Sequence, residues 1–128
     1  TTPDIAITQL TSTSPEALKS EQLVDVPLVE SVRNYVKLAQ AAGLAGVVCS
    51  AHEAADIASV TGPNFLRVTP GIRPAGSAVG DQSRVATPGN AASMGSSAIV
   101  VGRPITKADD PVAAYHAIRD DWNAGRKA

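Results

Sequence analysis

The chain has 128 residues, 44% of them hydrophobic, and a formal net charge of −1, which is typical of one soluble globular unit. The near-neutral charge argues against a basic surface for nucleic acid or a membrane, and 3% aromatic residues are too few for base stacking. Cys49 is the only cysteine, so an internal disulfide is excluded. No apolar run approaches the roughly 20 residues of a membrane helix, and we expect no export leader at either end. Residues 1–128 are therefore expected to form a single cytoplasmic unit with no nucleic-acid and no membrane partner.

Short apolar runs alternate with segments of helical spacing along the chain. The runs, rich in β-branched residues, predict strands at 4–10, 46–49, 65–69 and 98–101. Apolar spacing and end signals predict helices at 15–19, 27–42, 51–59, 88–94 and 111–124.

Several of these helices have recognisable start and stop signals. Gly43 follows the helix at 27–42 in the manner of a C-terminal glycine. Ser50 and Glu53 form a capping-box pattern before the next helix. We interpret the pair Asp109-Asp110, which precedes Pro111, as a helix cap rather than as two catalytic acids.

The order β-α-β-α-β-α-β-α indicates an α/β fold with a parallel sheet and right-handed crossovers. Four such strands leave two bare edges and an uncovered inner face. A complete (β/α)8 barrel usually takes roughly 200–250 residues, about twice the length of this chain. Three arrangements remain open: the sheet closes against a second chain, the chain is a fragment, or the sheet is open and flavodoxin-like.

Two of the predicted apolar strands are each followed by a glycine and, shortly after it, an arginine. One run is Val-Thr-Pro-Gly-Ile-Arg-Pro at 68–74, which leads into a loop with Gly-Asp-Gln at 80–82. The other is Val-Val-Gly-Arg-Pro-Ile-Thr at 100–106. Backbone N–H groups and a guanidinium at the carboxyl end of a parallel strand are suited to holding a phosphate. The pattern therefore predicts a phosphate-binding site formed by both runs.

These motifs resemble the C-terminal half of the bacterial orotidine 5′-phosphate decarboxylase family. The resemblance covers residues 4–122 and rests on a series of segments in the family's order and spacing. They are Gln-Leu-Thr-Ser-Thr-Ser at 9–14, Val-Val-Cys-Ser at 47–50, the run at 68–74, Gly-Asp-Gln with Arg84, and Val-Gly-Arg-Pro-Ile-Thr at 101–106. The resemblance implies half of a (β/α)8 TIM barrel, strands five to eight with their helices. It also implies decarboxylation of orotidine 5′-monophosphate to uridine 5′-monophosphate in de novo pyrimidine biosynthesis, without a cofactor.

The resemblance implies that four residues hold the substrate's phosphate. Arg103 and the Gly102 backbone match the phosphate clamp after strand eight, Gln82 reaches the phosphate from the loop, and Arg73 supports the same dianion. From the residues alone, two less favoured alternatives stay open: Arg73 pairs with an acidic neighbour at the barrel rim, and Gln82 is a solvated loop residue.

Four further residues match the family's pyrimidine pocket. Ser14 is similar to the hydroxyl that touches the base and meets the loop glutamine, and it is also a candidate cap for the helix that starts at Pro15. Leu10, Val48 and Pro70 match positions on the apolar side of the pocket, where core and site residues are alike in type.

The family's catalytic array is missing from the sequence. It consists of a Lys after strand two and an Asp-x-Lys-x-x-Asp segment at strand three, whose last Asp comes from the partner subunit of a homodimer. The lysines here occur in no such context; they are Lys19, Lys37, Lys107 and Lys127. We therefore expect no catalytic residue in this chain, and no activity unless the N-terminal half is supplied by the same or a separate chain.

Other chemistry has little support. No His, Cys and carboxylate spacing suits a metal, and we expect no cofactor. His52 and His116 are expected at the surface, and Cys49 as a small buried hydrophobe. Two alternatives to the decarboxylase stay open: a non-catalytic phosphate-binding half-barrel or assembly module, and another barrel enzyme acting on a sugar phosphate.

Overall fold

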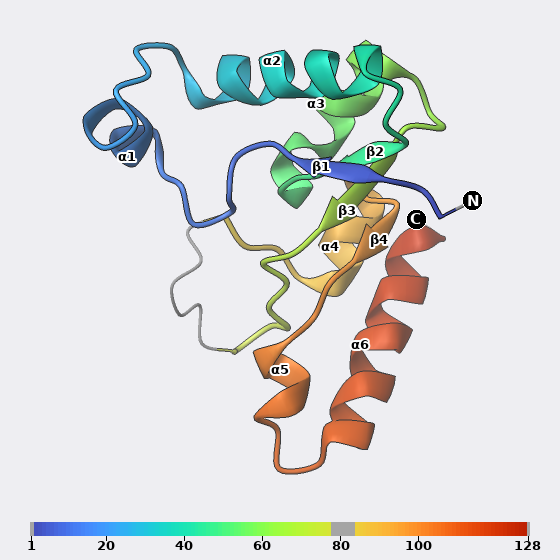
Figure 1. Cartoon of the computed structure of the whole chain (residues 1–128). Helices are drawn as coiled ribbons and strands as arrows, with labels where there is room; N and C mark the ends of the chain where they lie inside the picture. Colours follow the sequence, from blue (N-terminus) through green and yellow to red (C-terminus); the bar gives the residue numbers. More distant parts are fainter. Residues whose placement is uncertain (1, 78–83, 128) are drawn as a thin grey trace.

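The computed structural model describes residues 2–77 and 84–127, and it contains the expected parallel sheet. The four strands are paired in chain order, all parallel. They are β1 (Ile5–Ile7), β2 (Gly46–Val48), β3 (Leu66–Thr69) and β4 (Ala98–Ile99). The prediction of half a (β/α)8 barrel is confirmed for this arrangement of strands and helices (Figure 1).

All four strands are shorter than the sequence predicted, and the two outer strands, β1 and β4, lose the most. β1 ends at Ile7. The N–H and the hydroxyl of the next residue, Thr8, both donate hydrogen bonds to the Val48 carbonyl, at 3.5 and 3.1 Å. β4 stops at Ile99, although the N–H of Val100 still reaches the Thr69 carbonyl at 2.9 Å. The residue after Thr69 is a proline, which has no N–H to extend the ladder.

All five predicted helices are present, with ends shifted by one or two residues. They are α1 (Pro15–Ser20), α2 (Leu28–Ala41), α3 (Ala51–Thr61), α4 (Pro88–Ser93) and α6 (Pro111–Arg126). A sixth, α5 (Arg103–Thr106), was not predicted. Its four residues are too few to show helical periodicity.

The predicted end signals act as expected. Gly43 has φ +86°, and the Leu44 N–H donates to the Ala39 carbonyl at 3.1 Å, as in a Schellman motif. The capping box at the start of α3 is present, with the Ser50 N–H donating to the Glu53 carboxylate at 3.0 Å. Asp110, not Asp109, caps α6 by accepting from the N–H of Ala113 at 3.0 Å.

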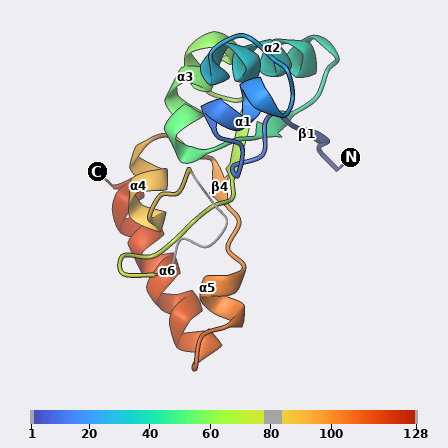
Figure 2. The same ribbon diagram turned by 90° about the vertical axis from the view of Figure 1, so that its left-hand side faces the viewer.

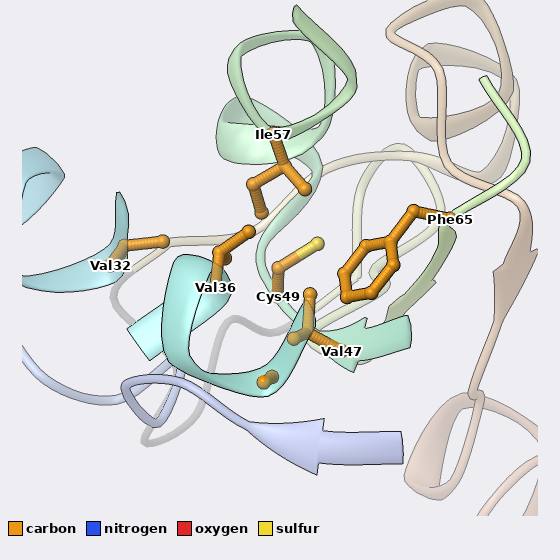
Figure 3. Close-up of a cluster of buried hydrophobic side chains, with 7 residues drawn as sticks. Val32, Val36, Val47, Cys49, Ile57 and Phe65 are labelled. Carbon is orange, nitrogen blue, oxygen red and sulfur yellow. The ribbon is translucent and has the colours of Figure 1, made fainter. Parts of the chain in front are cut away.

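The main core lies between the sheet and helices α2 and α3 (Figure 3). Val47 and Cys49 are fully buried there against side chains of both helices and of the segment before β3. The labelled partners are Val32, Val36, Ile57 and Phe65. Alternate residues of the strands therefore point to the helices, which is how a barrel strand divides its side chains between two layers.

A second cluster joins the other end of the sheet to α4 and α6. Ile72, Ala86 and Ala91 are buried in it, and Trp122 of α6 packs against them. Within the described residues, both clusters lie on the same face of the sheet, whereas a flavodoxin-like sheet has helices on both faces. The opposite face is left open, with Ile7 59% and Val100 52% exposed.

Helices α4 and α6 approach each other closely at Gly89 and Gly125. A Cβ added at Gly125 would overlap the Gly89 carbonyl oxygen, so glycine is required by the packing. Asp121 of α6 also accepts from the N–H of Gly89 at 3.0 Å and stabilises the first turn of α4.

We predict that Gly125→Ala destabilises the fold by about 1–3 kcal/mol, the usual cost of overpacking. Alanine has the better helix propensity by about 1 kcal/mol, so a loss of stability isolates the clash with Gly89. Urea unfolding followed by circular dichroism measures this, with Asn123→Ala on the exposed side of α6 as control. A Gly125→Ala chain as stable as the control would contradict the close packing.

Candidate functional site

The sequence-predicted site residues follow the carboxyl ends of different strands. Leu10 and Ser14 come after β1, Pro70 and Arg73 after β3, and Arg103 after β4. Val48 is the last residue of β2, and Gly102 precedes α5. Because all strands are parallel, their carboxyl ends lie at the same end of the sheet. Barrel enzymes have their active sites at this carboxyl-terminal end. Gln82 lies outside the described residues.

Gly102 and Arg103 form the turn after β4. The Gly102 carbonyl accepts from the N–H groups of Ile105 and Thr106, at 2.9 and 3.0 Å, and so starts helix α5. Both Gly102 and Arg103 are exposed at this turn. Arg103 is the first residue of α5, close after the end of β4, and a guanidinium at such a position is suited to contact with an anion.

Arg73 is held in the segment between β3 and α4. Its backbone N–H donates to the Ala86 carbonyl at 2.9 Å, and its guanidinium donates to the Ile72 carbonyl at 2.8 Å. Among the described residues the guanidinium forms no ion pair with a carboxylate. Asp81 lies outside the described residues, so the alternative of an acidic partner stays open. Arg73 is only half-buried and has further N–H groups to donate.

Ser14 caps α1 as the sequence allowed. Its hydroxyl oxygen accepts from the Ala17 N–H at 3.1 Å, and the residue is half-buried. A hydroxyl that accepts one hydrogen bond still has a proton to donate. Capping and contact with a ligand are therefore compatible at this position.

The three apolar candidates differ in burial. Leu10 is 60% exposed, so it is no part of the core of this chain. Val48 and Pro70 are half-buried, at the ends of β2 and β3. The exposed and half-buried apolar surface at this edge has the character of a pocket wall.

The sequence reasoning missed the ion pair between Arg84 and Glu53. In the sequence, Arg84 belongs to the Gly-Asp-Gln segment and Glu53 to the capping box of α3, and no local pattern links the two. Their side chains are 13% and 11% exposed. Arg84 also donates to the backbone carbonyls of Leu10 at 2.6 Å and Gln9 at 3.2 Å. One guanidinium therefore ties the segment before α4 to the start of α3 and to the segment after β1.

The segments on either side of residues 78–83 lie side by side. Ile72 bridges Ala86 in parallel, and the Ala86 N–H donates to the Gly71 carbonyl at 3.3 Å. His52, exposed as expected, donates from Nε2 to the Val85 carbonyl at 2.9 Å. These bonds fix 71–73 and 85–86 relative to α3.

Among the described residues, the Cys49 thiol, the Asp56 carboxyl and the Arg33 guanidinium have shifted pKa values. Burial, together with the Glu53 carboxylate, raises the pKa of the Cys49 thiol to about 12. Cys49 is therefore a neutral thiol at physiological pH and no nucleophile. The Arg33 guanidinium donates to Asp56 at 2.7 and 2.5 Å, which lowers the pKa of that carboxyl and joins α2 to α3.

Within residues 2–77 and 84–127, no cluster of three or more His, Cys, Asp and Glu side chains is arranged to hold a metal ion. None of the helices in that part of the chain is long and apolar enough to cross a membrane.

Comparison with known proteins decides the family. The model of the orotidine 5′-phosphate decarboxylase / HUMPS family matches residues 2–118, nearly all of the sequence. The chain belongs to this family. The resemblance seen in the sequence is thereby confirmed. The predicted fold class, an α/β half-barrel, is confirmed as well.

Two curated relatives are named orotidine 5′-phosphate decarboxylase. The one from Cutibacterium acnes is 97% identical over 128 residues, which is all of this chain and 54% of that protein. The one from Streptococcus uberis is 59% identical over 120 residues, 94% of this chain and 52% of the relative. The chain thus spans about half the length of the curated relatives that it matches.

Solved structures are likewise matched over about half of their length. Orotidine 5′-phosphate decarboxylase from Lactobacillus acidophilus matches with a TM-score of 0.76 and 47% identity, over 94% of this chain and 49% of that one. An uncharacterized conserved protein from Geobacillus kaustophilus matches with a TM-score of 0.73 and 43% identity, over 93% and 48%. The fold of this chain therefore matches about half of each of these longer structures.

We predict that Glu53→Gln or Arg84→Met destabilises the fold by about 3–5 kcal/mol, since each leaves the other charge buried without its partner. The double variant loses less than the sum of the two single losses. Urea unfolding measures all three variants. Lys19→Met, in the exposed pair with Asp25, is the control and changes stability by about 0.5 kcal/mol or less. Strict additivity of the two single losses would contradict a direct pair.

Proposed function

We propose that this chain supplies the phosphate- and pyrimidine-binding half of an orotidine 5′-phosphate decarboxylase. The enzyme converts orotidine 5′-monophosphate to uridine 5′-monophosphate and CO2, in pyrimidine biosynthesis in the cytoplasm. One observation supports this most. The family's motif residues after β1, β3 and β4 all follow the carboxyl ends of parallel strands, so they lie at the same end of the sheet.

The phosphate is held by Arg103, the Gly102 backbone and Arg73, with Gln82 reaching it from the loop. A guanidinium with neighbouring backbone N–H groups gives short, charge-assisted hydrogen bonds to a dianion. The phosphate is remote from the reacting carbon and takes no part in breaking the C–C bond. The free energy of binding it serves to orient the base for the transition state.

The pyrimidine lies between Ser14 and the apolar residues Leu10, Val48 and Pro70. The Ser14 hydroxyl donates to the base while its oxygen continues to cap α1. When the C–C bond breaks and CO2 leaves, the electron pair stays on the ring carbon, and a donor placed at the pyrimidine edge stabilises the negative charge that develops on the ring. The apolar wall excludes water and strengthens that interaction.

Proton transfer comes from elsewhere. The lysines of this sequence lack the family's Asp-x-Lys-x-x-Asp context, so the Lys/Asp array belongs to the N-terminal half of the barrel, in the same or a separate polypeptide. The assembled enzyme is a homodimer, and it uses no cofactor. This chain alone binds without turning over substrate.

Reconstitution tests the proposal. The chain is assayed for loss of orotidine 5′-monophosphate absorbance alone, then with the N-terminal half of the Cutibacterium acnes relative. We expect turnover only in the mixture, with the N-terminal half alone as control. Turnover by this chain alone would overturn the assignment of the acid and base. Binding of uridine 5′-monophosphate by the mixture without turnover would favour the non-catalytic binding module.

We predict that Arg103→Ala weakens binding of uridine 5′-monophosphate to the reconstituted enzyme by about 1.5–3 kcal/mol, the range for a charge-assisted hydrogen bond. This is a roughly 10- to 150-fold rise in the dissociation constant. Calorimetric titration measures it. Arg126→Ala, at the other end of α6 from the site, is the control (Figure 1). An unchanged dissociation constant would remove Arg103 from the phosphate site.

A further inference from the structure

Gln9, shortly after the end of β1, is a buried amide with no place in the proposed site. The residue is 6% exposed, and both polar atoms of its side chain are hydrogen bonded. Its Nε2 donates to the Ser31 hydroxyl at 3.0 Å, and its Oε1 accepts from Nε2 of Gln22 at 3.1 Å. The next residue, Leu10, is 60% exposed, so Gln9 faces the protein whereas Leu10 faces outward.

The amide of Gln9 joins three elements that follow one another in the chain. Gln9 comes after β1, Gln22 comes just after α1, and Ser31 lies near the start of α2. The bond between Gln9 and Gln22 therefore closes a loop that contains the turn at 10–13 and all of α1. Figure 2 looks onto this loop, with α1 near α2. Because Ser31 is also 6% exposed, its bond to Gln9 anchors the loop within the protein.

The backbone of the same loop is held from a second side by Arg84. Its guanidinium donates to the carbonyls of Gln9 and Leu10, at 3.2 and 2.6 Å. The Leu10 carbonyl also accepts from the N–H of Thr13 at 2.9 Å, which closes the turn that leads to Ser14. The orientation of residues 10–14 is thus set by two side chains, Gln9 and Arg84, that lie outside the proposed pocket.

We propose that Gln9, through its bond to Ser31, is a positioning residue for the base side of the substrate site. This role rests on the proposed function, in which Leu10 and Ser14 contact the pyrimidine. A turn that is already anchored to a helix loses little conformational freedom when the base binds, so the anchor contributes to affinity. The proposed phosphate residues follow β3 and β4 instead, and they do not depend on this amide.

Two substitutions remove the anchor at different places. Gln9→Met keeps the length of the side chain without its amide. Ser31→Ala deletes the hydroxyl that accepts from Gln9, at a position on α2 that is no part of the proposed pocket and where alanine is the better helix former. Gln40→Met is the matched control, because Gln40 lies at the other end of α2 and its Nε2 donates to the Thr61 carbonyl at 3.0 Å.

Binding of two ligands tests the proposal. Each variant is made in the chain joined to the N-terminal half of the Cutibacterium acnes relative as one polypeptide, so that association of two halves does not enter the measurement. Calorimetry measures the dissociation constant of uridine 5′-monophosphate. Displacement titration measures that of ribose 5-phosphate, which carries the phosphate and no base. Circular dichroism checks the fold, and Ser31→Ala carries the test where Gln9→Met does not fold.

The loss of affinity is expected for one ligand only. Gln9→Met and Ser31→Ala should raise the dissociation constant of uridine 5′-monophosphate about 3- to 10-fold, the contribution of one neutral hydrogen bond. The dissociation constant of ribose 5-phosphate should be unchanged, because the phosphate residues are untouched. Gln40→Met should alter neither constant.

The comparison of ligands separates positioning from a general loss of stability. A less stable fold weakens both ligands together, and that result would overturn the proposal. Unchanged binding of uridine 5′-monophosphate by Gln9→Met and Ser31→Ala would overturn it as well, with the proposed function intact. If the unaltered polypeptide fails to bind uridine 5′-monophosphate, the proposed function itself is wrong, and the role of Gln9 falls with it.

Discussion

The parallel hydrogen bonding of four short strands is the constraint on which the rest of this structure depends. It runs without interruption from β1 to β4, and every crossover therefore returns to the same end of the sheet. The segments that follow the strands then gather at one edge, where Ser14, Arg73 and Arg103 are found. The proposed site is thus a consequence of strand direction rather than of any contact between distant helices.

The Glu53–Arg84 pair shows how that edge is held together. Burying two charges is costly, and the cost is offset because Arg84 also donates to two backbone carbonyls and Glu53 accepts from a backbone N–H. The pair joins three segments whose own hydrogen bonds are mostly local. It holds together the segments around the proposed phosphate site.

The same sheet leaves one layer of the fold uncovered. Helices α2, α3, α4 and α6 bury one face of the strands, and the face with Ile7 and Val100 is open. The chain spans about half the length of its curated relatives, and the open face corresponds to the interior of a barrel.

The sequence by itself determined the local features and the order of the fold. Gly43, the Ser50–Glu53 capping box and the alternation of strands with helices depend on residues close together in the chain, and all were predicted. The motif series likewise sufficed to identify the family. The roles given to Gln82 and the other site residues stay predictions, because sequence resemblance supplies them.

Tertiary structure decided what depends on residues far apart. Arg84 and Glu53 are 31 positions apart, and only the packing of α3 beside the segment before α4 brings them together. β1 and β4 are shorter than expected because neighbouring strands end, a fact absent from their own residues. Local pattern sets which segments become strands and helices, whereas strand ends, buried charge pairs and open faces are set by the neighbours.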